Sequence, residues 1–105
     1  NKYKDNENLF LEKLYDIVGA GVNISESVPS AISIAYYAQD PNRCALLCAN
    51  LAGDTDTIGA MATAICGAFK GLDYIKEEYV ESLNKANDID FASYISILMN
   101  GRTCI

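Results

Sequence analysis

One apolar segment limits the folds open to this chain more than any other feature. Residues 58–69 contain no charged side chain, and small residues recur there at spacings of three and four. At 12 residues the segment is shorter than the roughly 20 that a membrane span requires. Small side chains let helix axes approach closely, and a helix that is apolar all round needs cover on every side. The segment therefore predicts a core helix buried inside a bundle.

The rest of the chain also carries the start and stop signals of helices. No run alternates with the period of two that marks a half-buried strand. Asp40-Pro41 is typical of a helix cap and first turn, and Gly71 suits a helix end. The predicted fold is all-α, a compact bundle of about six short helices with short connections. Six such helices barely cover the central one, so either the packing is tight or more protein surrounds it.

Two other helix starts carry weaker signals. Ser25 or Ser27 can cap the second helix, which places Pro29 in its first turn, where a missing N–H does no harm. Asp88 can cap the last helix, whose apolar stripe follows at three- and four-residue spacings.

Charge and cysteine placement exclude several classes of protein. The formal net charge is −6 and the pI about 4.4, which disfavours binding to nucleic acid or to an anionic membrane surface. The cysteines, at positions 44, 48, 66 and 104, lie among small apolar residues and lack the paired spacing of a zinc site. We therefore expect buried, reduced thiols in a cytoplasmic protein with no nucleic-acid or membrane partner.

An acidic run, Gly53-Asp54-Thr55-Asp56-Thr57, joins two apolar segments. Carboxylate and hydroxyl oxygens are the ligands that Mg²⁺ and Mn²⁺ prefer. The chain has no His, so the usual nitrogen ligand for zinc is missing. Two carboxylates this close repel each other unless a cation or a proton lies between them. The run is therefore a candidate metal site.

Helix capping is an alternative role for the same acids. Asp and Thr are preferred helix caps, so one of them can cap the following helix, although two acids and two threonines exceed what a cap needs. An EF-hand loop that starts at Asp54 would place Ile65 where Glu is required, which excludes it. A phosphatase with an Asp-x-Asp pair would need a strand over residues 45–51, whose pattern is helical instead. A metal site and a helix cap both stay open.

Residues 50–62 (NLAGDTDTIGAMA) and 67–71 (GAFKG) resemble the ADP-ribosylglycohydrolase family. Weaker similarity at residues 19–21, 26–31 and 75–79 extends the resemblance over roughly residues 15–83. The family is all-α and has a binuclear Mg²⁺ or Mn²⁺ site. The resemblance therefore implies the same fold for this chain and two Mg²⁺ (or Mn²⁺) ions as its cofactors.

In this resemblance Asp54, Asp56 and Thr57 match the family's C-terminal metal ligands, whereas Ala52 stands where a second glycine is usual. The family's other ligands lie in a Thr-Asp-Asp-type motif, which this chain lacks. Residues 1–105 then correspond to the C-terminal part of an ADP-ribosylglycohydrolase-like domain. The absent N-terminal half would be its partner and would supply the remaining ligands.

The resemblance implies a hydrolase that cleaves the glycosidic bond of ADP-ribose attached to a protein or a small molecule, with this segment inactive alone. The turn at Gly21, together with Ser27, resembles a loop that lines the adenosine side, although a helix stop followed by a cap accounts for these residues more simply. Two alternatives remain: a non-catalytic family relative, and a helical interaction module whose acids are helix caps.

Overall fold

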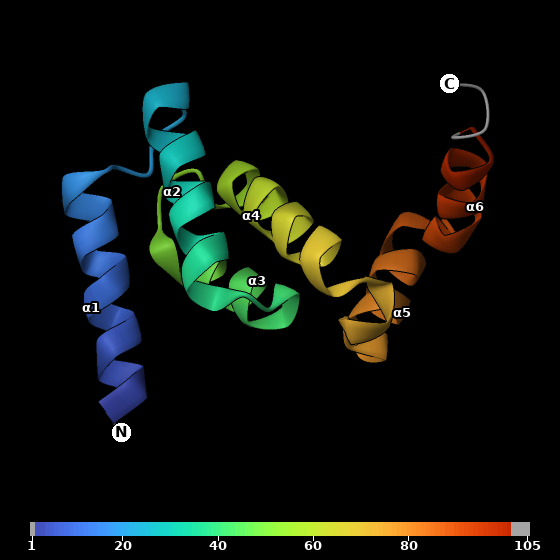
Figure 1. Ribbon diagram of the computed structural model, residues 1–105, viewed down its shortest axis with the longest axis horizontal. Coiled ribbons are helices and arrows are strands. Elements are labelled where there is room, and N and C mark those ends of the chain that lie inside the picture. Colours follow the sequence, from blue (N-terminus) through green and yellow to red (C-terminus); the bar gives the residue numbers. More distant parts are fainter. Residues whose placement is uncertain (1, 102–105) are drawn as a thin grey trace. The chain divides into compact units, whose positions relative to one another are not determined.

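The computed structural model describes residues 2–101, with side chains from residue 6 onward. The chain divides into two compact units, Asn1–Ile75 and Lys76–Ile105, which are described separately. Their elements, coloured along the chain in Figure 1, are α1 (Lys2–Ile17), α2 (Ile24–Ala38), α3 (Pro41–Leu51), α4 (Thr55–Lys70), the short 3-10 helix η1 (Leu72–Tyr74), α5 (Glu77–Asn87) and α6 (Phe91–Gly101). The described residues contain no strand, so the all-α prediction is confirmed and the phosphatase alternative fails because α3 precedes the acids.

The first unit has its core where α2, α3 and α4 meet, and α1 packs against α3 at its side (Figure 1). The side chains of Ile34 and Ile58 are fully buried there. The ring of Phe10 stacks on that of Tyr37 with 4.1 Å between the centroids, which ties α1 to α2. Burial of apolar surface is the dominant favourable term in folding, so this contact region carries most of the unit's stability.

The central helix α4 is buried on one face only. Ile58, Ala62 and Cys66 follow at four-residue spacing and face the core. By contrast, Ile65 and Phe69 are 47% and 68% exposed. Of the two alternatives for its cover, tight packing by the described helices is therefore wrong, because α2 and α3 contact α4 but leave Ile65 and Phe69 exposed. Within the described residues the opposite face has no cover.

The predicted start is correct for α3 and wrong for α2. Asp40 caps α3 as predicted, because its Oδ1 accepts the N–H of Asn42 at 2.8 Å and that of Arg43 at 3.4 Å. The second helix begins earlier than Ser25 or Ser27 would allow, with Asn23 at the cap position. Ser27 is therefore buried inside α2, and Pro29 lies beyond the first turn.

The second unit contains α5 and α6, and neither helix has a buried residue. Asp88 does not cap α6 as predicted. It closes α5 in the left-handed conformation, with φ of 52°. Asp90 takes the predicted role, because its Oδ1 accepts the N–H of Ala92 at 3.1 Å.

The cysteines of the first unit are free thiols in the core. Cys44, Cys48 and Cys66 are buried and form no disulfide, as predicted. Cys104 lies outside the described residues. A hydrogen bond with Cys48 raises the pKa of the Cys44 thiol, and burial acts in the same direction. Cys44 therefore keeps its proton at neutral pH and behaves as a small apolar core residue.

Candidate metal site

The acidic run forms the turn between α3 and α4. Ala52 and Gly53 both have positive φ, at 70° and 75°, and reverse the chain after α3. Asp54 then occupies the cap position of α4, and the helix begins at Thr55. Asp56 and Thr57 therefore lie in the first helical turn, and the three predicted ligands fall within four consecutive residues around one helix start.

Asp54 does not use its carboxylate as a helix cap. Its side chain makes no capping hydrogen bond, although it occupies the position where one would form. Instead Asp54 Oδ1 accepts a hydrogen bond from Thr57 Oγ1 at 3.0 Å. Two of the three predicted ligands are thus brought together, and helix capping does not account for Asp54.

Asp56 is exposed and ionised. Interaction with the Asp54 carboxyl lowers the pKa of Asp56, and the backbone N–H groups of Thr57 and of Asp56 itself act in the same direction. The positive end of the α4 dipole adds to this effect, because a helix N-terminus favours negative charge. Asp56 therefore presents a carboxylate to solvent across the neutral pH range.

The backbone of this turn is held by a distant segment. The N–H of Asp54 donates to the carbonyl oxygen of Ala20 at 2.7 Å, in the connection between α1 and α2. Gly53 lies against the same carbonyl, and a Cβ at that position would collide with it. The acidic turn therefore rests on the Gly19–Gly21 turn.

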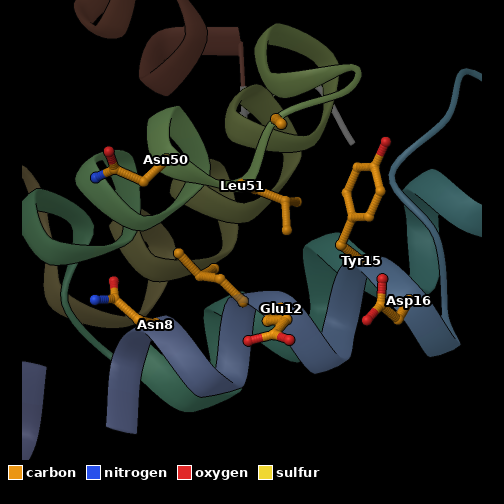
Figure 2. A pocket seen from close by; sticks show the side chains of 8 residues that line it. Asn8, Glu12, Tyr15, Asp16, Asn50 and Leu51 are labelled. Atoms are coloured by element: carbon orange, nitrogen blue, oxygen red, sulfur yellow. The ribbon is translucent and has the colours of Figure 1, made fainter. Parts of the chain in front are cut away.

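Two hollows flank the acidic turn in the first unit. The first, of about 350 Å³, lies between α3 and α4, and its lining includes Asp56, Thr63 and the buried Cys48. The second, of about 470 Å³, lies between α1 and the end of α3 (Figure 2). Figure 2 shows Glu12 and Asp16 on α1, with Leu51 across from them on α3. None of the three predicted ligands lines the second hollow, so the first is the one that adjoins the candidate site.

Of the residues predicted for the adenosine side, Gly21 lies in the connection that supports the turn and Ser27 lies in the first turn of α2. Gly21 is half-buried, and the space beside it is occupied by the Glu26 carboxylate, whose Oε2 lies 2.6 Å from the position of a Cβ at residue 21. Ser27 is 3% exposed. Sequence reasoning did not assign Glu26 or Ser30 a role here, although the Gly19-x-Gly21 spacing followed by an acid was visible.

The donor set suits a hard divalent cation. Asp54, Asp56 and Thr57 offer carboxylate and hydroxyl oxygens, which Mg²⁺ and Mn²⁺ prefer over sulfur or imidazole. Among residues 2–101 no group of three or more His, Cys, Asp or Glu could hold a metal ion by itself. Mg²⁺ needs about six ligands. These three residues therefore fit part of a coordination shell and leave positions for water or other protein groups.

The comparison with known families agrees with this arrangement. The family model described as ADP-ribosylglycohydrolase matches residues 3–103, almost the whole chain. This all-helical chain with an acidic turn before α4 therefore belongs to the ADP-ribosylglycohydrolase family. No solved structure matches it.

Curated relatives lead to the same family. The chain is 55% identical over 92 residues to the uncharacterized protein YegU of Escherichia coli (strain K12), a match that covers 87% of this chain and 28% of YegU. It is 31% identical over 97 residues to human ADP-ribosylhydrolase ARH3, which covers 82% of this chain and 27% of ARH3. The zebrafish ARH3 (Danio rerio) matches at 31% over 99 residues, with 27% of its length covered. The chain thus spans little more than a quarter of these relatives.

No helix among the described residues is both long and apolar enough to cross a membrane.

Proposed function

We propose that this chain is the C-terminal part of a metal-dependent hydrolase that cleaves the glycosidic bond of ADP-ribose. The observation that carries the proposal is the arrangement of the acidic turn. The Asp54 carboxylate makes no capping hydrogen bond, and the Asp56 carboxylate is exposed and ionised. Membership of the ADP-ribosylglycohydrolase family and the similarity to proteins named ADP-ribosylhydrolase support the substrate class. The substrate would be an ADP-ribosylated protein or an ADP-ribose-containing small molecule.

In this proposal Asp54, Asp56 and Thr57 bind two Mg²⁺ (or Mn²⁺) ions together with residues of an N-terminal half outside this chain. Bound divalent cations would hold ribose oxygens, activate water and stabilise negative charge as the bond breaks. Asp54 and Asp56 would supply the negative charge that attracts the ions. The hydrogen bond from Thr57 Oγ1 to Asp54 Oδ1 fixes the orientation of the Asp54 carboxylate before any ion arrives.

The turn at Gly21 with Ser27 is proposed to support the adenosine side through its backbone. Ser27 is buried and Gly21 is half-buried, so neither offers an exposed side chain to a ligand. A general acid or base is assigned to the N-terminal half. The three free thiols are consistent with a reducing, cytoplasmic setting, which we propose for the whole protein.

The second candidate function is a non-catalytic family relative or a helical interaction module. The observation in its favour is the exposed apolar surface of α6, where Leu98 is 72% exposed and Ile97 66%. An exposed apolar face of this kind is typical of a surface that contacts another protein. In this case the acids would be solvated surface groups without a metal.

Thermal melts with and without Mg²⁺ or Mn²⁺ distinguish the two functions. We expect the metal to raise the melting temperature of the complete protein, in which the N-terminal half supplies the remaining ligands, because a ligand that binds only the native state stabilises it by mass action. Asp56→Ala should abolish this rise and leave the melting temperature in chelator nearly unchanged, since Asp56 is exposed and exposed side chains contribute little to stability.

Asp16→Ala is the matched control. It removes one exposed carboxylate from the neighbouring hollow of Figure 2, so the metal-dependent rise should persist. If the complete protein without substitutions shows no rise with either metal, the hydrolase proposal loses its main support. If Asp16→Ala abolishes the rise and Asp56→Ala does not, the ion binds in the other hollow.

A further inference from the structure

The acidic turn owes its position to a contact that spans 34 positions of the sequence. The N–H of Asp54 lies 2.7 Å from the carbonyl oxygen of Ala20, and Ala20 is 4% exposed. Gly53 is pressed against the same carbonyl and has a φ of 75°. A side chain at position 53 would push the two segments apart. The two turns therefore meet backbone to backbone, and the position of the Ala20 peptide sets the position of Asp54.

The Ala20 peptide is in turn held by two side chains of α2. The hydroxyl of Ser30, which is fully buried, donates to the carbonyl oxygen of Gly19 at 2.6 Å. The Glu26 carboxylate lies against both Gly19 and Gly21, in the space that their missing side chains would fill. One buried hydrogen bond and one close-fitting carboxylate thus fix the peptides on either side of Ala20.

We propose that Ser30 and Glu26 are positioning residues for the metal site and act on Asp54 through the Ala20 carbonyl. This inference rests on the proposed function, because it assigns Ser30 and Glu26 a role toward the ligands Asp54, Asp56 and Thr57. Neither residue would touch the ion. Ser30 holds Gly19, the rigid peptide units carry that constraint to Ala20, and Ala20 fixes the backbone from which the Asp54 carboxylate projects.

The consequence for binding is one of geometry. Mg²⁺ demands near-ideal octahedral coordination, so a small displacement of one ligand weakens binding. Groups behind the ligands that fix their orientation typically change metal affinity by about 10- to 100-fold when they are mutated. Loss of the Ser30 hydroxyl should therefore lower affinity for the ion even though the ligands themselves are intact.

The test compares Ser30→Ala with Ser33→Ala. Both serines lie on α2 and donate to a backbone carbonyl, but Ser33 Oγ bonds Pro29 of its own helix at 2.7 Å and does not reach the turn. Two quantities are measured for each variant of the complete protein: the affinity for Mn²⁺ alone by titration, and the hydrogen-exchange protection of the Asp54 amide. Both are taken well below the melting temperature, and protection of the Cys48 amide in the core of the first unit is followed beside that of Asp54, so that a general loss of stability is recognised.

We expect Ser30→Ala to lower Mn²⁺ affinity about tenfold and to reduce protection of the Asp54 amide, with Ser33→Ala unchanged in both. Equal values for the two variants would overturn the inference. If the complete protein without substitutions binds no Mn²⁺, the proposed function fails, and Asp54 protection still decides whether Ser30 holds the turn. If Ser30→Ala does not fold, Glu26→Ala takes its place, because it empties the space beside both glycines and leaves the core hydrogen bond intact.

Discussion

In the first unit, α3 and α4 each begin with an aspartate at the cap position, and they use it differently. At the start of α3, Asp40 accepts the backbone N–H groups of Asn42 and Arg43. At the start of α4, Asp54 makes no capping hydrogen bond and accepts the Thr57 hydroxyl instead. The difference teaches that an aspartate at the cap position does not always cap its helix with its carboxylate. The surrounding backbone also matters: of these two aspartates, only Asp54 donates its own N–H to a distant turn.

The largest effect is expected when Gly53 is replaced, because this glycine lets the turn before α4 approach the Ala20 carbonyl. We expect Gly53→Ala to destabilise the chain by about 1–3 kcal/mol, because φ is positive there and a Cβ collides with the Ala20 carbonyl. The measurement is the free energy of unfolding from denaturant titration. Gly67→Ala is the control. It lies inside α4 with open space around it, and it should stabilise by about 0.5–1 kcal/mol. Equal effects would mean that the Gly53 contact does not constrain the turn.

Removing the first aspartate should have the next largest effect. Asp40→Ala deletes a cap with two backbone hydrogen bonds and should cost about 0.5–2 kcal/mol of stability. The loss should be the same in Mg²⁺ and in chelator, because Asp40 is not part of the proposed site. A loss of stability that differs between Mg²⁺ and chelator would show that Asp40, like Asp54, takes part in metal binding.

The smallest effect is expected at the second aspartate. In chelator, Asp54→Ala should change stability by no more than about 0.5 kcal/mol, as for a surface residue without a structural hydrogen bond to the backbone. The same variant should show no stabilisation by Mg²⁺ or Mn²⁺. Thermal melts beside those of Asp40→Ala provide the measurement. A loss in chelator as large as that of Asp40→Ala would mean that Asp54 caps α4 after all.

Local signals in the sequence were enough for the helical fold and for the residues of the acidic turn. Asp40-Pro41 and Gly71 marked helix ends correctly, because caps act on their nearest neighbours in the chain. Ser27 was misplaced because Asn23 starts α2 one turn earlier, and two candidate caps so close together cannot be ranked by propensity. Asp88 was misplaced for a similar reason, since Asp90 lies two residues on.

The contact that holds the acidic turn in place could not be predicted from local signals. The Ala20 to Asp54 hydrogen bond joins residues 34 positions apart, and no local pattern encodes such a pairing. The sequence also left open which face of α4 lacks cover. Composition shows that Ile65 and Phe69 are apolar, but only the arrangement of α2 and α3 decides that both stay exposed. Which surfaces meet is a property of the assembled chain, whereas sequence patterns report the preference of each element alone.

Ala52 has a consequence for how the acidic turn moves. Its φ of 70° and ψ of 177° lie in a region that is essentially reserved for glycine, where another residue stores about 1–3 kcal/mol of strain. That strain is released whenever the turn opens, so opening costs less free energy here than it would with glycine at position 52. If the proposed ion binds at this turn, easier opening would raise the rates at which it enters and leaves. The protein with alanine here would then exchange that ion faster than an Ala52→Gly variant, and each ion would stay bound for a shorter time.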